Sequence, residues 1–311
     1  MKLSRNLLRG LVIIFFAFIS TTAAAQLSIV LTNDDGYDQP GIQILRNALV
    51  AAGHNAVIVA PLTNQSGKGT GLFGDLGGKL NLQFHAAENA WSVDGTPTDT
   101  VRVALEILKL RPDVVISGIN FGENLGIVAN SSGTVSASVW ALESGYPAMA
   151  VSAGLNYAEA DLTPPFPSTI TAMKSAAPWV VELLDILSAA RHHGGPLLPK
   201  GIGLNINYPA VANPGPAVLT RLSRGYNTLT YELKPDVDFA ITGNIVNEIH
   251  TWPAPLNPDK KNDAEMFAAG YITVTAIDGD WTASAASLHA VLERLRKLAA
   301  TERDARGRPQ R

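Results

Sequence analysis

The sequence contains no cysteine among its 311 residues. This absence excludes a disulfide framework, a thiolate zinc site, an iron–sulfur cluster and a cysteine nucleophile. Charged side chains are also few, at 16%, and the formal net charge of −3 gives no support to a general binder of polyanions. The hydrophobic fraction of 46% nevertheless provides enough apolar material for one large domain or two small ones.

Long apolar runs are confined to the N-terminus. Three basic residues precede an apolar run over residues 11–19, and three alanines follow at 23–25. This pattern predicts a secretory signal peptide over residues 1–25, since the apolar run is shorter than the roughly 20 residues of a spanning helix. An uncleaved anchor is the alternative. We expect an exported, periplasmic or secreted protein that starts near Gln26 and has no membrane attachment. Loss of the three basic residues in the signal peptide would make the net charge more negative, so we expect no specific nucleic-acid partner.

Strands and helices are expected to alternate in the first half of the chain. The predicted strands are 27–32, 56–60, 113–117 and 148–152, and the predicted helices are 41–52, 99–110 and 135–144. Thr96, Pro97 and Asp99 form a typical helix start, as N-cap, first and third helical residues. This alternation predicts an α/β fold with a mostly parallel sheet covered on both faces.

The second half is expected to be smaller and less regular. It contains a predicted helix over 170–188, in which Pro178 marks a candidate interruption, and predicted strands over 203–207 and 271–277. Residues 213–263 are rich in proline and turn residues and should form short strands at most. A closing amphipathic helix is expected over 284–298, followed by a disordered basic tail over 301–311.

Polar segments follow the predicted strands, where open α/β sheets bind ligands. The first contains Asp34 and Asp35, the second contains Ser66 at the start of a glycine-rich loop (residues 66–78), and the third contains Asn120. A fourth segment, 130–135, begins a predicted helix whose backbone N–H groups would favour an anion.

Each of these segments also has a purely structural interpretation. The acids can form an ordinary turn, Ser66 a polar turn, Asn120 a loop contact, and Ser132 or Thr134 a plain helix cap. Taken together, however, two carboxylates, a hydroxyl and an amide make an all-oxygen set suited to Mg²⁺ or Mn²⁺. Such an ion could hold a phosphate against the helix N-terminus and activate a water.

Several blocks of the sequence resemble the SurE family of survival proteins, which are 5′/3′-nucleotidases. The resemblance spans almost all of the chain after residue 25, and the blocks occur in the family's order. They are VLTNDDGYDQP (30–40), VAPLTNQSGKG (59–69), VDGTPTDTV (93–101), DVVISGINFGENLG (113–126) and SGTV (132–135), with later echoes LNINYP (204–209), TRLSR (220–224) and AAGYITVT (268–275).

The resemblance implies a metal-dependent phosphomonoesterase acting on nucleoside 5′-monophosphates, with 3′-monophosphates as further candidates. It implies a phosphatase domain over residues 26–300 with a Rossmann-like α/β fold, a three-layer sandwich. In this domain the metal site is expected in a Rossmann-like core over 26–153, followed by a C-terminal portion over 154–300. One Mg²⁺ or Mn²⁺ ion per subunit and a homodimer or homotetramer are expected. The implied metal ligands are Asp34, Asp35, Ser66 and Asn120, and the implied phosphate-binding residues are Asn124, Ser132, Gly133 and Thr134.

The resemblance further assigns one acid of the pair, Asp34 ahead of Asp35, to orient or deprotonate the attacking water. Two positions depart from the family pattern: many relatives carry His-Ser where this chain has Thr70 and Gly71, and His or Tyr where it has Ser131. Two other functions stay open. One is a phosphatase with an aspartyl-phosphate intermediate, for which the D-D-G order fits poorly. The other is an exported, non-catalytic phosphate- or nucleotide-binding protein.

Overall fold

The fold is given by a computed structural model that describes residues 26–73, 77–191, 194–223, 228–235, 241–248, 262–280, 287–289 and 291. The predicted signal peptide, the predicted tail and most of the predicted closing helix lie outside these residues. Within the described ranges, no helix combines the length and the apolar character needed to cross a membrane.

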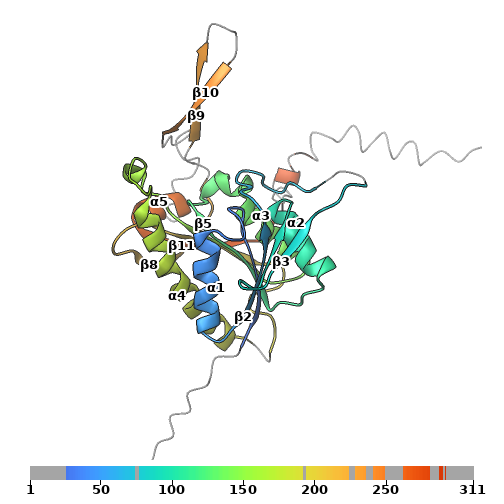
Figure 1. Ribbon diagram of the computed structural model, residues 1–311. Coiled ribbons are helices and arrows are strands. Elements are labelled where there is room, and N and C mark those ends of the chain that lie inside the picture. Colours follow the sequence, from blue (N-terminus) through green and yellow to red (C-terminus); the bar gives the residue numbers. More distant parts are fainter. Residues whose placement is uncertain are drawn as a thin grey trace, which may run out of the picture.

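A nine-stranded sheet forms the middle of the molecule (Figure 1), in the order β3-β4-β2-β1-β5-β6-β7-β11-β8. Neighbours from β4 to β7 are parallel, β3 and β11 pair antiparallel with β4 and β7, and β8 is parallel to β11. The strands are β1 Ser28–Thr32, β2 Asn55–Pro61, β3 Leu82–His85, β4 Ala90–Val93, β5 Val114–Phe121, β6 Ala148–Ala153, β7 Gly203–Tyr208, β8 Gly215–Thr220 and β11 Tyr271–Ile277.

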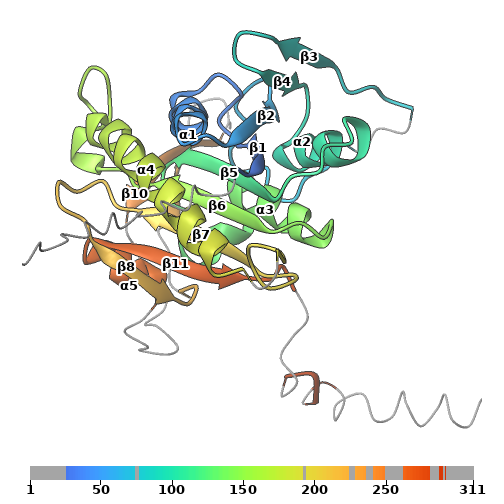
Figure 2. The ribbon, with the colours of Figure 1, turned by 90° about the horizontal axis from the view of Figure 1, so that it is seen from below.

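Helices cover both faces of the sheet, as Figure 2 shows. Residues of α1 and α4 pack with Ile29 and Leu31 of β1 in one core, and residues of α2 and α3 pack with Val30 in the other. Alternate strand residues therefore face opposite layers. The predicted three-layer α/β fold is confirmed. The helices are α1 Pro40–Ala51, α2 Pro97–Arg102, α3 Gly133–Glu143 and α4 Pro167–Ala189.

The strand order reverses direction at β1. From β1 the chain first builds outward through β2 and β4, and it then returns to β5 on the other side of β1. Ligands of open α/β sheets bind at such a switch point, beyond the carboxyl ends of the strands. The segments after β1 and at the end of β5 meet there, and they contain Asp34, Asp35 and Asn120.

Two predicted elements are longer than expected. Strand β5 continues through Phe121 instead of ending at Ser117, with a shift in its pairing with β6 between Ser117 and Asn120, so Asn120 lies in the strand. Helix α4 is continuous through Pro178. The candidate interruption at Pro178 is therefore wrong, and we attribute the continuity to Ala176, Ala177 and Val180, which are buried on either side of the proline and pack the helix onto the sheet.

The helix predicted over 99–110 begins at Pro97 and is shorter than expected. After Arg102 the chain passes into a π-helical turn, η1 Val103–Ile107. The predicted helix start is confirmed, because the Thr96 side chain accepts from the Asp99 N–H and the Asp99 side chain accepts in return from the Thr96 N–H. Strands β3 and β4 had no counterpart in the sequence prediction.

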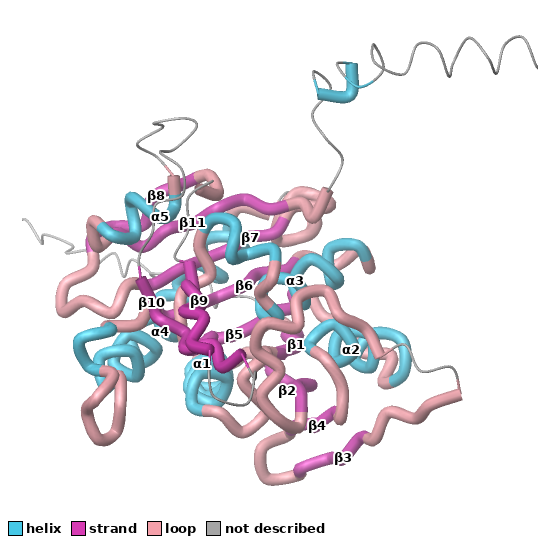
Figure 3. The backbone as a smooth tube through the Cα atoms, turned by 90° about the horizontal axis from the view of Figure 1, so that it is seen from above, coloured by secondary structure: helices cyan, strands magenta, loops and turns pink. Residues whose placement is uncertain are grey.

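Three strands from the second half of the chain, β7, β11 and β8, continue the same sheet. The remaining strands, β9 Thr228–Pro235 and β10 Ile241–Glu248, form a separate two-stranded ribbon. The ribbon extends away from the sheet (Figure 1), and seen from above it overlies the middle of the molecule (Figure 3). The short elements are η2 Gly126–Asn130, η3 Tyr157–Glu159 and α5 Asp263–Ala268.

Candidate functional site

The two adjacent acids lie in a tight turn directly after β1. Asn33 is fully buried and closes the turn, since its Nδ2 donates to the carbonyl oxygen of Gly36 (2.8 Å) and its Oδ1 accepts from the Gly36 N–H (3.2 Å). The chain therefore leaves extended geometry at this point. This bend removes the alternation that would send Asp34 and Asp35 to opposite faces of the sheet.

Asp34 is buried against the N-terminus of α3. Its Oδ1 accepts a hydrogen bond from the Thr134 hydroxyl at 2.6 Å. Burial raises the pKa of Asp34, while the Thr134 hydroxyl and backbone N–H groups that include those of Thr134 and Gly133 act in the opposite direction. The helix N-terminus therefore stabilises a carboxylate, consistent with the preference of this end of a helix for negative charge.

Gly133 provides the space for this contact. A Cβ atom at this position would lie 2.7 Å from Cβ of Asp34 and 3.0 Å from Cγ of Pro97. Both distances are far below an ordinary van der Waals contact. The acid can therefore reach the helix N-terminus only because residue 133 has no side chain.

Asp35 is held from the neighbouring strand. Its Oδ2 accepts from the backbone N–H of Phe121, the last residue of β5, at 3.1 Å. Burial and then the charge of Asp34 raise the pKa of Asp35 to about 7, against a lowering by the Phe121 N–H. Two adjacent acids, in which the charge of Asp34 raises the pKa of Asp35, form a local excess of negative charge.

Neither acid forms an ion pair with a cationic side chain among the described residues. The same part of the chain contains no group of three or more His, Cys, Asp or Glu side chains placed to hold a metal. A cation at this site would therefore be bound by two carboxylates completed by neutral oxygens. That donor set matches hard divalent ions better than zinc.

The two predicted neutral ligands lie in segments that border the acids. Asn120 is buried in β5, and its Nδ2 donates to the Gly122 carbonyl oxygen at 2.6 Å, which leaves Oδ1 without a hydrogen bond from the described residues. Ser66 is exposed and follows Gln65, whose N–H donates to the carbonyl oxygen of Asp34 at 2.7 Å. The structure thus brings both segments to the acids.

Asn124 is part of a buried network of amides. Its backbone N–H donates to Asn207 Oδ1 (2.7 Å), its carbonyl oxygen accepts from Asn205 Nδ2 (2.8 Å), and its side chain donates to the Ser152 hydroxyl (2.9 Å). Asn124 therefore anchors the loop after β5 onto β6 and β7. Asn205 and Asn207 were missed as site residues, although two polar residues at alternate positions of an otherwise apolar strand were a usable signal.

The side chains predicted to contact phosphate at the head of α3 are engaged within the protein. Ser132 is the N-cap and its hydroxyl accepts from the Val135 N–H at 3.1 Å, while the Thr134 hydroxyl binds Asp34. Ser131, one of the two departures from the family pattern, donates its hydroxyl to the Val128 carbonyl at 3.1 Å. An anion at this place would therefore meet backbone N–H groups rather than hydroxyls.

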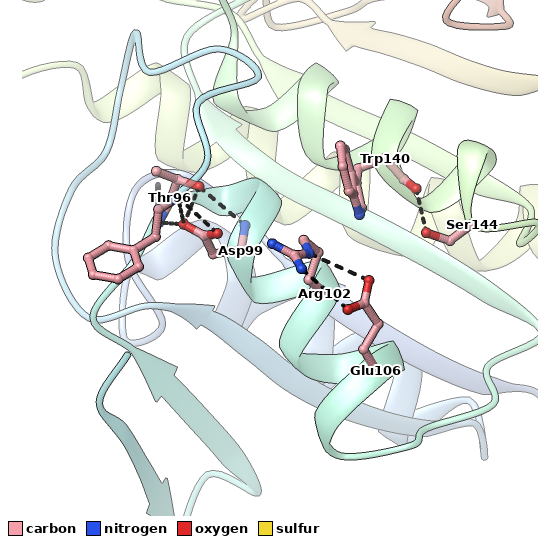
Figure 4. A network of polar contacts seen from close by, with 7 residues as sticks. Thr96, Asp99, Arg102, Glu106, Trp140 and Ser144 are labelled. Atoms are coloured by element: carbon pink, nitrogen blue, oxygen red, sulfur yellow. Dashed lines mark hydrogen bonds and ion pairs between the residues drawn. The ribbon is translucent and has the colours of Figure 1, made fainter. Parts of the chain in front are cut away.

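Asp99 is a further buried acid, and its hydrogen bonds hold the glycine-rich loop in place. Asp99 accepts from the Phe73 N–H (3.0 Å) and from the N–H and hydroxyl of Thr96 (3.0 and 2.8 Å), as Figure 4 shows for Thr96 and Asp99. The Thr96 hydroxyl also lies 2.6 Å from the Gly71 carbonyl oxygen. The loop is thus held at Asp34 through Gln65 and at the start of α2 through these two residues.

The comparisons with known proteins agree with this geometry. The family model described as "Survival protein SurE" matches residues 29–228. A protein of Picosynechococcus sp. named 5′-nucleotidase SurE is 33% identical over 275 residues, which cover 82% of this chain and 92% of the relative. A protein of Methanocella arvoryzae with the same name is 40% identical over 212 residues, covering 65% and 75% of the two chains.

A solved structure extends the similarity to the fold. The crystal structure of the SurE protein from Aquifex aeolicus superposes with a TM-score of 0.68 and 26% identity, covering 88% of this chain and 99% of the other. The match includes the mostly parallel sheet, and the family model covers the acid pair, the glycine-rich loop, the end of β5 and the head of α3. The chain therefore belongs to the SurE family.

Proposed function

We propose that this chain is a divalent-metal-dependent 5′-nucleotidase that hydrolyses nucleoside monophosphates to nucleoside and phosphate. The observation that carries the proposal is the acid pair at the sheet's switch point, buried Asp34 and half-buried Asp35, which has no cationic partner among the described residues. Relatives that match over most of their length have the name 5′-nucleotidase, which supports an enzyme over a non-catalytic binding protein.

The residues at the site fit a divalent cation. Burial and the charge of Asp34 raise the pKa of Asp35, and a cation between the acids would offset both effects. The amide oxygen of Asn120 is available to such a cation. Asp34, Asp35, Ser66 and Asn120 would hold the ion. We assign Mg²⁺ or Mn²⁺, one per subunit, because hard oxygen donors suit these ions. When bound, such a cation polarises a phosphoryl group and promotes deprotonation of the attacking water.

The protein's own groups then have separate tasks. The N–H groups of Gly133 and Thr134 at the head of α3 would receive phosphate oxygens near Asp34, as backbone donors at helix N-termini do. Thr134 keeps Asp34 in place through its hydroxyl. Asp34, or in second place Asp35, would orient the attacking water or take its proton. Asn124, Asn205 and Asn207 keep the neighbouring loop fixed on the sheet.

The decisive experiment assays the chain from Gln26 on a panel of nucleoside 5′- and 3′-monophosphates, with Mg²⁺, with Mn²⁺ and with chelator. Turnover should require the metal and should be abolished in Asp35→Ala. Asp38→Ala is the matched control, since Asp38 is an exposed acid three residues further on. Full activity of Asp35→Ala, or tight nucleotide binding without turnover in either metal, would overturn the proposal.

We also propose that the protein is exported to the periplasm or secreted, and that it forms a homodimer or homotetramer. Support for export comes from the basic, apolar and alanine pattern of residues 1–25. Support for assembly comes from the β9–β10 ribbon, because an isolated two-stranded ribbon has little stability of its own. N-terminal sequencing of the exported protein and its mass in solution test the two statements.

A further inference from the structure

Phe121 links the acid pair to a group of aromatic side chains. It is the last residue of β5, and its backbone N–H donates to Oδ2 of Asp35. Its side chain is 36% exposed, which is unusual for a phenylalanine that ends a buried strand. Asp35 is therefore bonded to the backbone of a residue whose aromatic ring is partly exposed.

The ring of Phe121 belongs to an aromatic cluster, defined here as Phe121, Tyr157 and Phe166. Phe166 lies in the middle, edge to face with Phe121 (ring centroids 5.8 Å, 80° between the planes) and with Tyr157 (6.4 Å, 88°). Tyr157 is 38% exposed. Aromatic surface that stays exposed beside a polar site is more typical of a binding surface than of a folding core.

The loop that carries the other two rings is firmly built. Glu159 accepts hydrogen bonds from the N–H and the hydroxyl of Ser168 (2.9 and 2.8 Å) and from Nδ2 of Asn156 (3.1 Å). Thr169 closes the base of the loop by donating to the Gly154 carbonyl oxygen at 2.8 Å. Rings on such a loop are held in place before a ligand arrives, which limits the entropy lost on binding.

The loop also lies beside the acid-pair segment. The Leu155 N–H donates to Glu123 at 2.9 Å, and a Cβ at Gly122 would lie 3.6 Å from the Leu155 side chain. Residues 121–123 therefore run from the acids to the aromatic loop without a gap. A ligand with a charged end and an aromatic end, such as a nucleoside monophosphate, could place its charged end at the acid pair and its aromatic end at the aromatic cluster.

We propose that Phe121, Phe166 and Tyr157 form the surface on which the substrate's nucleobase stacks. The inference rests on the proposed function, because it places the phosphate at Asp34 and Asp35 and extends the same substrate toward the cluster. Stacking on a side-chain ring is available to every base, so the cluster selects nucleotides over base-free phosphate esters without choosing one base.

The test compares kcat/KM for adenosine 5′-monophosphate and for ribose 5-phosphate, which has no base. Phe166→Leu should lower the value for the nucleotide about tenfold, within the range that loss of one stacking contact produces, and leave ribose 5-phosphate within twofold. Phe121→Leu should lower the ratio of the two values, nucleotide over ribose 5-phosphate, about tenfold. Phe121→Tyr should retain the preference for the nucleotide. All these variants keep the backbone N–H that holds Asp35.

Phe84→Leu is the matched control, since Phe84 is 46% exposed and pairs with Trp91 on the outermost strands β3 and β4. It should leave both substrates unchanged. Equal losses on the two substrates in Phe121→Leu, or no loss on the nucleotide, would overturn the cluster's role. Calorimetric binding of adenosine gives a readout independent of turnover, and loss of that binding in Phe121→Leu is expected.

The two proposals fail differently. Adenosine that binds wild type and not Phe121→Leu, with no hydrolysis of either ester, would contradict the nucleotidase and support the base surface. Hydrolysis of both esters with equal kcat/KM in wild type and variants, and no adenosine binding, would support the phosphatase and contradict the base surface.

Discussion

The Thr134 hydroxyl donates to Oδ1 of Asp34 across 2.6 Å, joining the head of α3 to the turn after β1. A helix N-terminus that stabilises a phosphate can equally stabilise a carboxylate, and the N-terminus of α3 already contacts the carboxylate of Asp34. The acid and a substrate phosphate would therefore share one set of N–H donors. Substitutions around Asp34 can separate the two interactions.

Thr134→Val removes the hydroxyl and keeps the shape of the side chain. The free energy of unfolding should fall by about 1–3 kcal/mol, the usual cost of losing a hydrogen bond to a charged group. The pKa of Asp34 should rise further, since that bond favours the ionised form, so the acid limb of the pH–rate profile should move to higher pH. Thr134→Ser is the control and should keep both properties near wild type; an unchanged profile in Thr134→Val would contradict the assignment.

Gly133→Ala should displace Asp34, because the new Cβ would lie 2.7 Å from the Asp34 Cβ. A displacement of this size near a reacting centre can cost about 100-fold in rate, and we expect a loss of that order in kcat/KM. The control is Gly53→Ala, where an added Cβ meets nothing within 4 Å but φ is +90°, so stability should fall without loss of activity in the folded fraction. Near-normal activity in Gly133→Ala would show that the acid tolerates movement.

Releasing the glycine-rich loop from Asp99 should expose it to protease. In Asp99→Asn and Thr96→Val the bonds to Phe73 and Gly71 weaken, and trypsin should cut after the exposed Lys68 several times faster than in wild type. The KM for nucleotide should rise, since Ser66 lies in this loop. Glu106→Gln breaks the exposed pair with Arg102 further along the same chain segment and should change neither. Cleavage at the wild-type rate in both variants would refute the tether.

Without metal, Asp35 should make the fold less stable as the pH rises. Its pKa is about 3.8 when unfolded and about 7 when folded, so the folded state binds the extra proton between these values. The free energy of unfolding should fall across this window by at most about 1.4 kcal/mol per pH unit. Urea unfolding in chelator from pH 5 to 8 should show a flatter dependence for Asp35→Asn. A stability that rises with pH equally in both proteins would contradict the shift.

Periodicity and capping signals predicted the sheet's central strands and the helices α1 to α4, because those elements are amphipathic or continuously apolar. Strands β3 and β4 were not predicted, because each has only four residues and the residues between them and the glycine-rich loop have no strand-like pattern. The extension of β5 through Phe121 was missed for a different reason. The strand was predicted to end at Ser117, and only the pairing of Asn120 and Phe121 with β6 keeps the chain in the sheet beyond that residue.

Within the site, the sequence predicted which segments converge but not how their side chains are used. Strand ends identified the segments of Asp34, Ser66 and Asn120, and a predicted helix start identified the segment of Thr134. The partners of these side chains depend on distances across the fold. The Thr134 hydroxyl binds the Asp34 carboxylate and not the phosphate that was expected there. Asn124 is held by Asn207 of β7. Phe121 holds Asp35 through its backbone N–H, which has no sequence signature.

The bond between Thr134 and Asp34 joins residues 100 positions apart. Ribosomes make the N-terminus first, so both acids emerge before the helix that holds one of them has been made. A ligand that binds both the acids and the head of α3 can therefore stabilise only chains in which α3 has already folded onto the sheet. The free energy of its binding then adds to the free energy of folding. Occupancy of the site would report maturation of the protein as well as readiness for catalysis.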